Sequence, residues 1–527
     1  MFRAFGRSLR SFASETEGNA AILFGLALIP VMLGVGVAID YGRALIVREH
    51  MADAADSAAL AIGSWPGLDE DELKLKAQQF FDANFPPTKI GTAGAVDVKF
   101  EGDDIKVTVS GQVPTTFMKL ANIDTVGIGV TNTITKKERN IELVLVLDTT
   151  GSMQGSKLSA MKSAAKKMVD TLFDGKATST TLKIAVVPYS VAVNIGSDKL
   201  DSGWLDKATY SAANASSHPV AFEDLDKTNG MSALELYKKI GKSWTGCVRE
   251  REGSAYELTD ASPSSGTPAS LWVPYFAPDE PDTSGVSYSN NYLSDGSYSS
   301  ATCVTAPPSG ANNSTKEQFK RQCFTGKYKS FSSSSKGPAY NCPPTKITPL
   351  TDTRQTVVDA IDALAANGNT VIPAGLLWGW RALSSSAPFT EGAAYSDEKW
   401  VKAMVLLTDG ENDVGQGSNG INKSVYNAFG YAKNGNLGNT NGNEADAKLD
   451  AKTTAVCNAI KQASGSAGGK EEIQLYTIGF QVTSASKTLL RGCATKPDMF
   501  YDSPSNEQLA GIFQDIAQGL GELRIAQ

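Results

Sequence analysis

Apolar and polar positions divide the chain into regions of different pattern, and the first is an apolar run at residues 20–39. This run of 20 residues contains no charged side chain. At 1.5 Å of rise per residue, a helix of this length spans about 30 Å, the thickness of the hydrocarbon core of a bilayer. Pro30 and three glycines in the run are better tolerated in a membrane helix than in a soluble one. The pattern predicts a transmembrane anchor at 20–39.

The residues after the anchor keep a helical pattern. Small and apolar side chains recur at intervals of three and four up to about Ile62, and residues 43–62 contain no Gly or Pro. Shorter patterned segments follow, so residues 40–139 are expected to form a stalk with a small α+β unit. The expected elements of that unit are a helix over 69–84 and strands over 96–100, 105–113 and 126–135.

From residue 140 onward, short apolar runs alternate with amphipathic helical patterns. Repeated strand–helix units predict an α/β fold with a doubly wound, mostly parallel sheet. The expected strands are 141–147, 182–187 (ended by Pro188), 401–407, 473–480 and 499–501. The expected helices are 156–173, 353–366, 373–383, 445–464, 487–491 and 506–520.

Two long polar insertions interrupt this alternation. The insertion at about 196–345 holds four of the six cysteines and is too long for a simple loop, so it predicts a disulfide-pinned subdomain. The insertion at about 410–444 is rich in Asn and Gly and is expected to be mobile. Both follow strands of the predicted sheet, so they should lie at the edge where ligands bind in such folds. They indicate either a partner-specific surface or a lid.

Oxygen-bearing side chains gather at the ends of the predicted strands. The segment Asp148-Thr149-Thr150-Gly151-Ser152 directly follows the strand at 141–147. Asn369-Thr370 precedes a predicted helix, and Asp409 closes the strand at 401–407. Carboxylate and neutral oxygens are the ligands that a hard divalent cation needs. The pentapeptide alone would be a weak signal, because it also suits the N-terminal cap of the helix at 156–173.

In this order and strand context, the three segments resemble the metal-ion-dependent adhesion site of von Willebrand factor type A (VWA) domains. The family's D-x-S-x-S motif and two later loops hold the ion, and Thr150 here replaces the common serine. The resemblance implies Mg²⁺ (or Mn²⁺ or Ca²⁺) with a coordination position open to a partner's carboxylate. A VWA fold with an empty, structural site is the alternative. The implied ligands are Asp148, Thr150, Ser152, Thr370 and Asp409.

Charge and histidine content narrow the function classes. A net charge of −7 argues against a nucleic-acid partner, which would call for a basic face. The two histidines, His50 and His218, have no nucleophile motif nearby, so a Ser-His-Asp or Cys-His enzyme is not expected. We expect no enzyme and no small-molecule substrate. A metal-dependent phosphohydrolase is the enzymatic alternative, although Thr150 replaces the second aspartate of its D-x-D-x-T pattern.

The six cysteines form no CxxC pair, which argues against a zinc or redox site. Their even number and wide spacing indicate disulfides in an oxidising compartment, with free thiols as the alternative. Cys457 and Cys493 flank one predicted strand, and their bridge would close a loop worth about 3–4 kcal/mol. Six cysteines allow 15 pairings. Nesting along the chain suggests the remaining pairs Cys247–Cys342 and Cys303–Cys323.

Basic residues before the anchor bear on its orientation. Arg3, Arg7 and Arg10 precede the apolar run, so residues 1–19 are expected to be a cytoplasmic tail. The rest of the chain would then lie outside the cytoplasm, where disulfides form. A cleaved signal peptide is the alternative, although the run is longer than a usual signal and no clear cleavage site closes it.

Short motifs on both sides of residue 140 carry a family resemblance. They are Glu17-Gly18-Asn19-Ala20-Ala21-Ile22, Ala38-Ile39-Asp40-Tyr41-Gly42-Arg43, Ala52-Asp53-Ala54-Ala55-Asp56-Ser57-Ala58-Ala59-Leu60-Ala61, Leu147–Met153, Leu407–Asn412 and Tyr476–Phe480. The first three look like the N-terminal region of TadE/TadG-like proteins, and the last three belong to the VWA pattern. Their combination is similar to TadG-like proteins of the bacterial Tad (Flp) pilus system.

That resemblance implies a single-pass protein of the bacterial inner membrane with a cytoplasmic N-terminus and a periplasmic bulk. Residues 140–527 would form a VWA domain that engages pilus-assembly or envelope proteins through its metal site. The alternative is a structural envelope anchor or spacer, in which the ion only stabilises the fold.

Overall fold

The computed structural model describes ten stretches of the chain, which divide into two compact units. One unit runs to Glu138 and the other extends from Arg139 to Arg524. Most of the predicted basic tail, including Arg3, Arg7 and Arg10, lies outside the described residues. The described stretches are 18–63, 70–86, 91–101, 104–135, 139–253, 255–333, 335–415, 420–437, 444–466 and 472–525.

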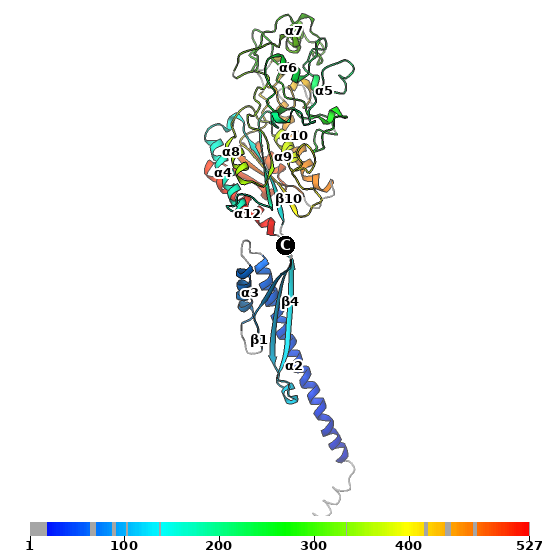
Figure 1. Cartoon of the computed structure of the whole chain (residues 1–527), viewed down its shortest axis with the longest axis vertical. Coiled ribbons are helices and arrows are strands. Elements are labelled where there is room, and N and C mark those ends of the chain that lie inside the picture. The colour runs from blue at the N-terminus through cyan, green and yellow to red at the C-terminus, as the bar shows by residue number, and fades with distance from the viewer. Residues whose placement is uncertain are drawn as a thin grey trace, which may run out of the picture. The chain divides into compact units, whose positions relative to one another are not determined.

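A single helix carries the predicted anchor and stalk. Helix α2 (Gly18–Gly63) is 46 residues long and contains Pro30 (Figure 1). Most large apolar side chains between Ile22 and Ile46 are exposed, and this part of α2 is long and apolar enough to cross a membrane. From Met51 to Ile62 the same helix buries a face made largely of alanines. Helix α2 therefore fits a single-pass membrane anchor that continues as a packed stalk.

A helix and a small antiparallel sheet pack on the stalk. Strand β3 pairs with β4 along one edge and with β1 and β2 along the other. Val107 and Val109 of β3 share a core with Ala55 and Ala59 of α2 and with Phe81. The elements are α3 (Glu70–Asn84), β1 (Thr92–Ala93), β2 (Asp97–Glu101), β3 (Asp104–Pro114) and β4 (Thr125–Thr135).

An eight-stranded sheet forms the centre of the second unit. Strands β12, β11, β10, β5 and β6 lie side by side in this order and are parallel. Strands β7 and β9 both pair with β6 in antiparallel fashion, and β8 pairs with β7. The strands are β5 (Asn140–Asp148), β6 (Leu182–Tyr189), β7 (Val193–Asn194), β8 (Cys247–Val248), β9 (Thr348–Thr351), β10 (Trp400–Thr408), β11 (Gln474–Phe480) and β12 (Phe500–Ser503).

Helices cover both faces of this sheet (Figure 1). Leu143, Leu145 and Leu147 of β5 share a core with α4, α8 and α12, whereas Val144 and Val146 share one with α9, α10 and the polar insertion. The alternation follows from the pleat, which points successive side chains to opposite faces. The predicted mixed α/β architecture with parallel strands is confirmed. The helices are α4 (Ser156–Phe173), α8 (Arg354–Asp362), α9 (Ile372–Leu383), α10 (Ala445–Ser466), α11 (Ser484–Cys493) and α12 (Asn506–Ile525).

Several element boundaries differ from the sequence prediction, and two of these differences have a clear structural reason. Strand β6 continues past Pro188 to Tyr189. Within the described chain, the antiparallel strands β7 and β9 pair with β6 at its residues Ile184, Val186 and Tyr189. The missing N–H of Pro188 therefore breaks none of these pairings. Helix α8 ends at Asp362 rather than at residue 366. The chain leaves the helix early because Asn367 and Gly368 bond to the backbone of the segment after β5.

The first insertion, residues 196–345, carries two disulfides as predicted, but it belongs to the same compact unit as the sheet. Most of its aromatic residues belong to the core on one face of the sheet. The rings of Trp272 in the insertion and Trp378 in α9 lie 4.9 Å apart. Strands β7 and β8 also extend the sheet into the insertion. Its short helices are α5 (Pro219–Phe222), α6 (Ala233–Lys239) and α7 (Asn313–Cys323).

Three disulfides connect these parts. Cys247–Cys342 joins β8 to the segment before β9, and Cys303–Cys323 lies within the insertion. Cys457–Cys493 joins α10 to α11 across the strand between them. These are the three pairs that the sequence suggests, and they leave no free cysteine in the described chain.

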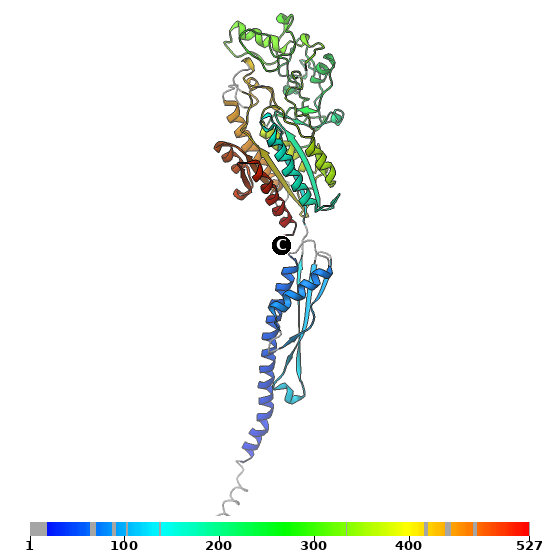
Figure 2. The ribbon, with the colours of Figure 1, turned by 90° about the vertical axis from the view of Figure 1, so that its left-hand side faces the viewer.

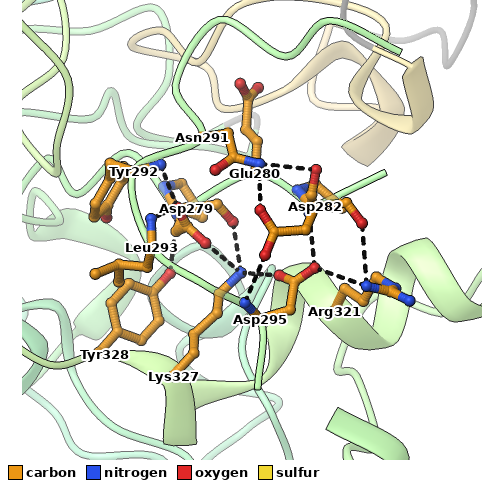
Figure 3. A network of polar contacts seen from close by, with 12 residues as sticks. Asp279, Glu280, Asp282, Asn291, Tyr292, Leu293, Asp295, Arg321, Lys327 and Tyr328 are labelled. Atoms are coloured by element: carbon orange, nitrogen blue, oxygen red, sulfur yellow. Dashed lines mark hydrogen bonds and ion pairs between the residues drawn. The ribbon is translucent and has the colours of Figure 1, made fainter. Parts of the chain in front are cut away.

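A network of charges holds the centre of the insertion (Figure 3). The Lys327 side chain is fully buried, and its Nζ lies 2.8 Å from Asp279 Oδ2 and 3.3 Å from Asp295 Oδ1. Arg321 pairs with the other oxygen of Asp295 at 3.2 Å. Backbone N–H groups of Tyr292 and Leu293 donate to Asp279 at 2.6 and 2.7 Å. Because these segments have little regular structure of their own, buried ion pairs fix how they cross.

The second insertion is largely packed where it is described, so the expectation of a mobile segment is wrong for residues 420–437. Tyr426, Phe429 and Tyr431 are buried, and the Tyr426 ring lies 5.1 Å from that of Tyr275. These aromatic residues outweigh the flexible Asn and Gly around them. Residues 416–419 and 438–443 lie outside the described part of the insertion.

Candidate metal centre

The predicted ligands lie where the order of the sheet reverses. The chain runs from β5 to β6 on one side and returns to β10 on the other side of β5. Leu147 of β5 pairs with Leu407 of β10, so the two strands end at the same level. In open α/β sheets this switch point, beyond the carboxyl ends of the strands, is where ligands bind. Asp148 and Asp409 follow those two paired residues.

The carboxylate of Asp148 is fully buried and fixed by its neighbours. Its Oδ1 accepts a hydrogen bond of 2.9 Å from the backbone N–H of Thr150. Its Oδ2 accepts one of 2.7 Å from the hydroxyl of Thr408 and a longer one of 3.4 Å from Tyr189. These donors hold the aspartate in one orientation at the end of β5.

Asp409 links the remaining oxygens of the first motif. Ser152 Oγ donates to Asp409 Oδ1 at 2.6 Å, and Thr150 Oγ1 lies 2.9 Å from Ser152 Oγ. The Nζ of Lys157, at the start of α4, lies 2.6 Å from Asp409 Oδ2. The structure therefore joins Asp409, Ser152 and Thr150 in one chain of contacts that begins on a lysine.

The segment at 367–370, which holds Asn369-Thr370, is tied to the segment after β5 by backbone hydrogen bonds. The N–H of Gly151 donates to the carbonyl of Gly368 at 2.8 Å, and the N–H of Asn367 donates to the carbonyl of Thr149 at 2.7 Å. These bonds bring Thr370 to the same end of the sheet. A Cβ added at Gly410, the residue after Asp409, would lie 3.8 Å from Thr370 Oγ1. All five predicted ligands thus come together.

Burial of two carboxylates in one place has an electrostatic cost. Desolvation, and secondly the charge of Asp409, raise the pKa of Asp148 to about 6. The same burial, with Asp148 next to it, raises the pKa of the Tyr189 hydroxyl above its usual range. The site thus makes the charged form of Asp148 less favourable than it is in water, and a positive charge placed there would offset this cost.

The side chains present fit a hard divalent cation. The five candidates offer two carboxylates and three hydroxyls, which is an oxygen-only set of the kind that Mg²⁺ or Ca²⁺ prefers. A cation would also relieve the repulsion that raises the pKa of Asp148. Among the described residues, no group of three or more His, Cys, Asp or Glu side chains is placed to hold a metal. A site here therefore depends on the hydroxyls.

Three neighbours of the site are absent from the sequence prediction. Thr408 and Tyr189 contact Asp148, and Lys157 contacts Asp409. Lys157 could have been suspected, because it is the first basic residue after the motif and opens the predicted helix. Nothing in the sequence pattern marks Tyr189, whose position depends on how β6 pairs with β5.

An open cavity of about 380 Å³ lies next to the segment at 367–370. We call it the lysine groove, because its lining includes Lys242 and Lys336 and no acidic residue. Phe331 contributes an aromatic surface, and the Nζ of Lys242 lies 5.4 Å from its ring centre. Asn367 also lines the groove and bonds to Thr149, so the groove adjoins the candidate metal centre. The full lining is Tyr237, Lys242, Ser243, Thr245, Phe331, Ser333, Ser335, Lys336, Gly337, Pro338, Ala339, Tyr340, Asn341 and Asn367.

Comparison with known families matches residues 18–63 to the family described as "Putative Flp pilus-assembly TadE/G-like". The matched segment has the same bounds as helix α2. The TadE/TadG-like resemblance of the anchor and stalk is therefore confirmed. A search among curated proteins found no match to the chain.

Several solved structures show a distant likeness to the chain. The pilus adhesin SpaC from Lactobacillus rhamnosus GG is 11% identical over 82% of this chain, with a TM-score of 0.30, and the chain covers 35% of that adhesin. The vWF domain of the type V pili tip protein Mfa5 from Porphyromonas gingivalis is 10% identical over 74% of this chain and 97% of that domain (TM-score 0.32). Proximal thread matrix protein 1 from the mussel byssus, with a zinc-occupied MIDAS motif, is 12% identical over 73% of this chain and 47% of that protein (TM-score 0.27). Scores this low carry no functional argument.

Proposed function

Taking the TadE/G-like match of residues 18–63 as the premise, we propose that this chain is a membrane-anchored component of Tad (Flp) pilus assembly that binds partner proteins. In this proposal residues 139–524 are a VWA-type domain. A divalent cation, Mg²⁺ or alternatively Mn²⁺ or Ca²⁺, is held at its switch point. A carboxylate of a pilus-assembly or envelope protein would complete the coordination of the ion. The ligands are Asp148, Thr150, Ser152, Thr370 and Asp409.

The observation that carries this proposal is the convergence of Ser152 and Asp409 beside Asp148. These residues are up to 261 positions apart in the chain, yet Ser152 Oγ and Asp409 Oδ1 lie 2.6 Å from each other. The buried Asp148 carboxyl lies close enough to Asp409 for that charge to help raise its pKa, so the pair is costly to the fold without a cation. A bound cation gives that arrangement a purpose.

The proposal places residues 40–527 in the periplasm, with the N-terminus in the cytoplasm of a single-pass inner-membrane protein. Three disulfides support an oxidising compartment for the second unit. The arginines before the anchor support the orientation of the helix. Protease protection of the intact chain in spheroplasts would report this orientation directly.

Capture of partner proteins tests whether their binding depends on the metal. The full chain is crosslinked in membranes of cells that assemble the pilus, in Mg²⁺ or in EDTA, and the captured proteins are quantified. We expect EDTA and the Asp409→Asn substitution each to reduce capture about tenfold, which corresponds to about 1.4 kcal/mol. The matched control is Asp362→Asn, which removes a surface ion pair with Lys166 and should leave capture unchanged.

A second candidate function is favoured by one observation, the ion pair of Lys157 with Asp409. If this pair and the hydroxyls only hold the strand ends together, the chain is an envelope anchor or spacer. Asp409→Asn would then lower the melting temperature, while capture from the same membranes stayed unchanged. Equal capture by this variant and the unchanged chain would therefore contradict metal-dependent binding.

The lysine groove gives the partner a second contact in this proposal. Lys242 and Lys336 are exposed, and neither forms an ion pair within the described chain. An acidic segment of the partner would be attracted to them, and like charges in an interface are unfavourable. We expect Lys242→Glu combined with Lys336→Glu to weaken capture about tenfold. Lys346→Glu, at an exposed ion pair outside the groove, is the control, and equal capture by all three proteins would exclude the groove from the interface.

A further inference from the structure

The tip of the β3–β4 hairpin carries apolar side chains that the described chain leaves exposed to a large extent. Phe117, Leu120 and Ile123 are 39%, 79% and 44% exposed. In the described part of the second unit, by contrast, no large apolar side chain is exposed. Apart from Leu60 and Leu75, the other exposed large apolar side chains belong to residues 22–46 of α2. The tip therefore shares its surface chemistry with the anchor.

Asp40 of α2 fixes the tip to the helix. Its carboxylate accepts hydrogen bonds from three successive backbone N–H groups, those of Thr116, Phe117 and Met118, at 3.0, 2.7 and 2.8 Å. Arg43, one turn further along α2, donates to the hydroxyl of Thr116 at 2.8 Å. Asp40 is the first charged residue after the apolar run, so the attachment lies where the predicted membrane span ends.

The tip also reaches back along the apolar run. Phe117 packs on Gly36, where an added Cβ would lie 2.5 Å from the Cβ of Phe117. Gly36 precedes Asp40 by four residues, or about 6 Å along the helix axis. Figure 2 shows the tip of the hairpin beside α2, on the side of its N-terminal half. The aromatic ring therefore lies level with the last turn of the uncharged segment.

We propose that residues 115–123 are a second membrane contact, which enters the boundary between lipid headgroups and acyl chains next to the anchor. Phe117, Leu120 and Ile123 contact acyl chains, while the exposed amine of Lys119 and the guanidinium of Arg43 meet the headgroups. Asp124 is the acidic residue nearest to this loop in sequence, and it is exposed directly before strand β4. Lipid is the occupant because the exposed surface of the tip continues that of the helix that crosses the bilayer.

Such a contact would set the orientation of the first unit on the membrane. A single helix can tilt and rotate in a bilayer, and flanking interfacial groups are what fix it. Two points of attachment, α2 and the hairpin tip, would hold the β1–β4 sheet at a defined angle to the membrane surface. The inference rests on α2 crossing the membrane and is independent of the candidate metal centre.

Site-directed spin labels test the inference in the full chain, reconstituted as single copies in nanodiscs. All six native cysteines are in disulfides, so an added cysteine is the only reactive thiol. The label is placed at Leu120→Cys, with Val31→Cys in the anchor and Lys99→Cys on the exposed strand β2 as references. Because position 120 is mostly exposed within the protein, the substitution leaves the packing intact.

We expect the label at position 120 to behave as the anchor label does, with oxygen accessibility several-fold above its accessibility to a water-soluble nickel complex. The same accessibilities at positions 120 and 99 would overturn the proposal. So would protection at position 120 that appears only when several copies share one nanodisc, because a second protein chain would then be the occupant. Asp40→Ala should increase the mobility of the label at position 120, seen as a change in its spectrum. An unchanged spectrum would show that Asp40 does not hold the tip.

Discussion

The Asp148→Asn variant should be more stable than the unchanged chain in EDTA at neutral pH, and should gain nothing from Mg²⁺. Burial raises the pKa of Asp148 to about 6, from 3.8 in the unfolded chain. Ionising this carboxyl therefore costs the cation-free fold about 3 kcal/mol, a cost that asparagine does not have. Asparagine can still accept from the N–H of Thr150 and can donate to the hydroxyl of Thr408, so the local contacts persist.

The pH dependence of this effect has a definite sign. Between pH 3.8 and about 6 the folded chain holds a proton on Asp148 that the unfolded chain has lost. The contribution of Asp148 to the free energy of unfolding therefore falls as the pH rises through this window, and the cost is complete above about pH 6. The Asp148→Asn variant should lack this decline, so its advantage in EDTA should vanish near pH 4.

A bound cation should make the unchanged chain more stable than the Asp148→Asn variant. At a Mg²⁺ concentration of about 1,000 times the dissociation constant, the unchanged chain gains about 4.1 kcal/mol, which exceeds the cost of about 3 kcal/mol that asparagine avoids. Thermal unfolding is followed by tryptophan fluorescence, since every tryptophan except Trp65 lies between residues 204 and 400. Asp362→Asn, at an exposed ion pair, serves as the control. If the unchanged chain melts at the same temperature in EDTA and in Mg²⁺, that result would contradict a cation at this site.

The alternation of strands and helices could be predicted because each element carries its own local signal. The apolar run before Asp148 is β5, and the amphipathic pattern at 156–173 has the bounds of α4. The predicted ligands also follow from local rules. Residues at the ends of neighbouring parallel strands must meet at one edge, so Asp148 and Asp409 converge once the order of the strands is fixed.

The rest depended on contacts that no local pattern encodes. The first insertion packs into the core of the sheet through residues such as Trp272, which are scattered among polar neighbours without periodicity. The early end of α8 follows from the bonds of Asn367 and Gly368 to the segment after β5. The pairing of Lys157 with Asp409 likewise joins elements separated by 252 residues in the chain. Long-range packing of this kind overrides local propensity.

The buried charge network of the insertion makes Lys327→Met the most damaging single substitution that we expect outside the candidate metal centre. The Lys327 side chain is fully buried, so methionine fills a similar volume but leaves the carboxylate of Asp279 without its cation. Removing one partner of a buried ion pair costs about 3–5 kcal/mol. Desolvation already raises the pKa of Asp279 despite Lys327, and the loss of the lysine would raise that pKa further. Protonation of Asp279 would then relieve the penalty in acid.

The destabilisation should therefore be larger at pH 8 than at pH 5, measured as the shift in the thermal unfolding of the full chain. Lys346→Met is the matched control, because Lys346 forms an exposed ion pair with Asp198 worth about 1 kcal/mol or less. The double variant Lys327→Met with Asp279→Asn should recover part of the loss, since no unpaired charge remains at position 279. If Lys327→Met melts as the Lys346 variant does, the network contributes little, and the Cys303–Cys323 disulfide and the aromatic core would be what fixes the insertion.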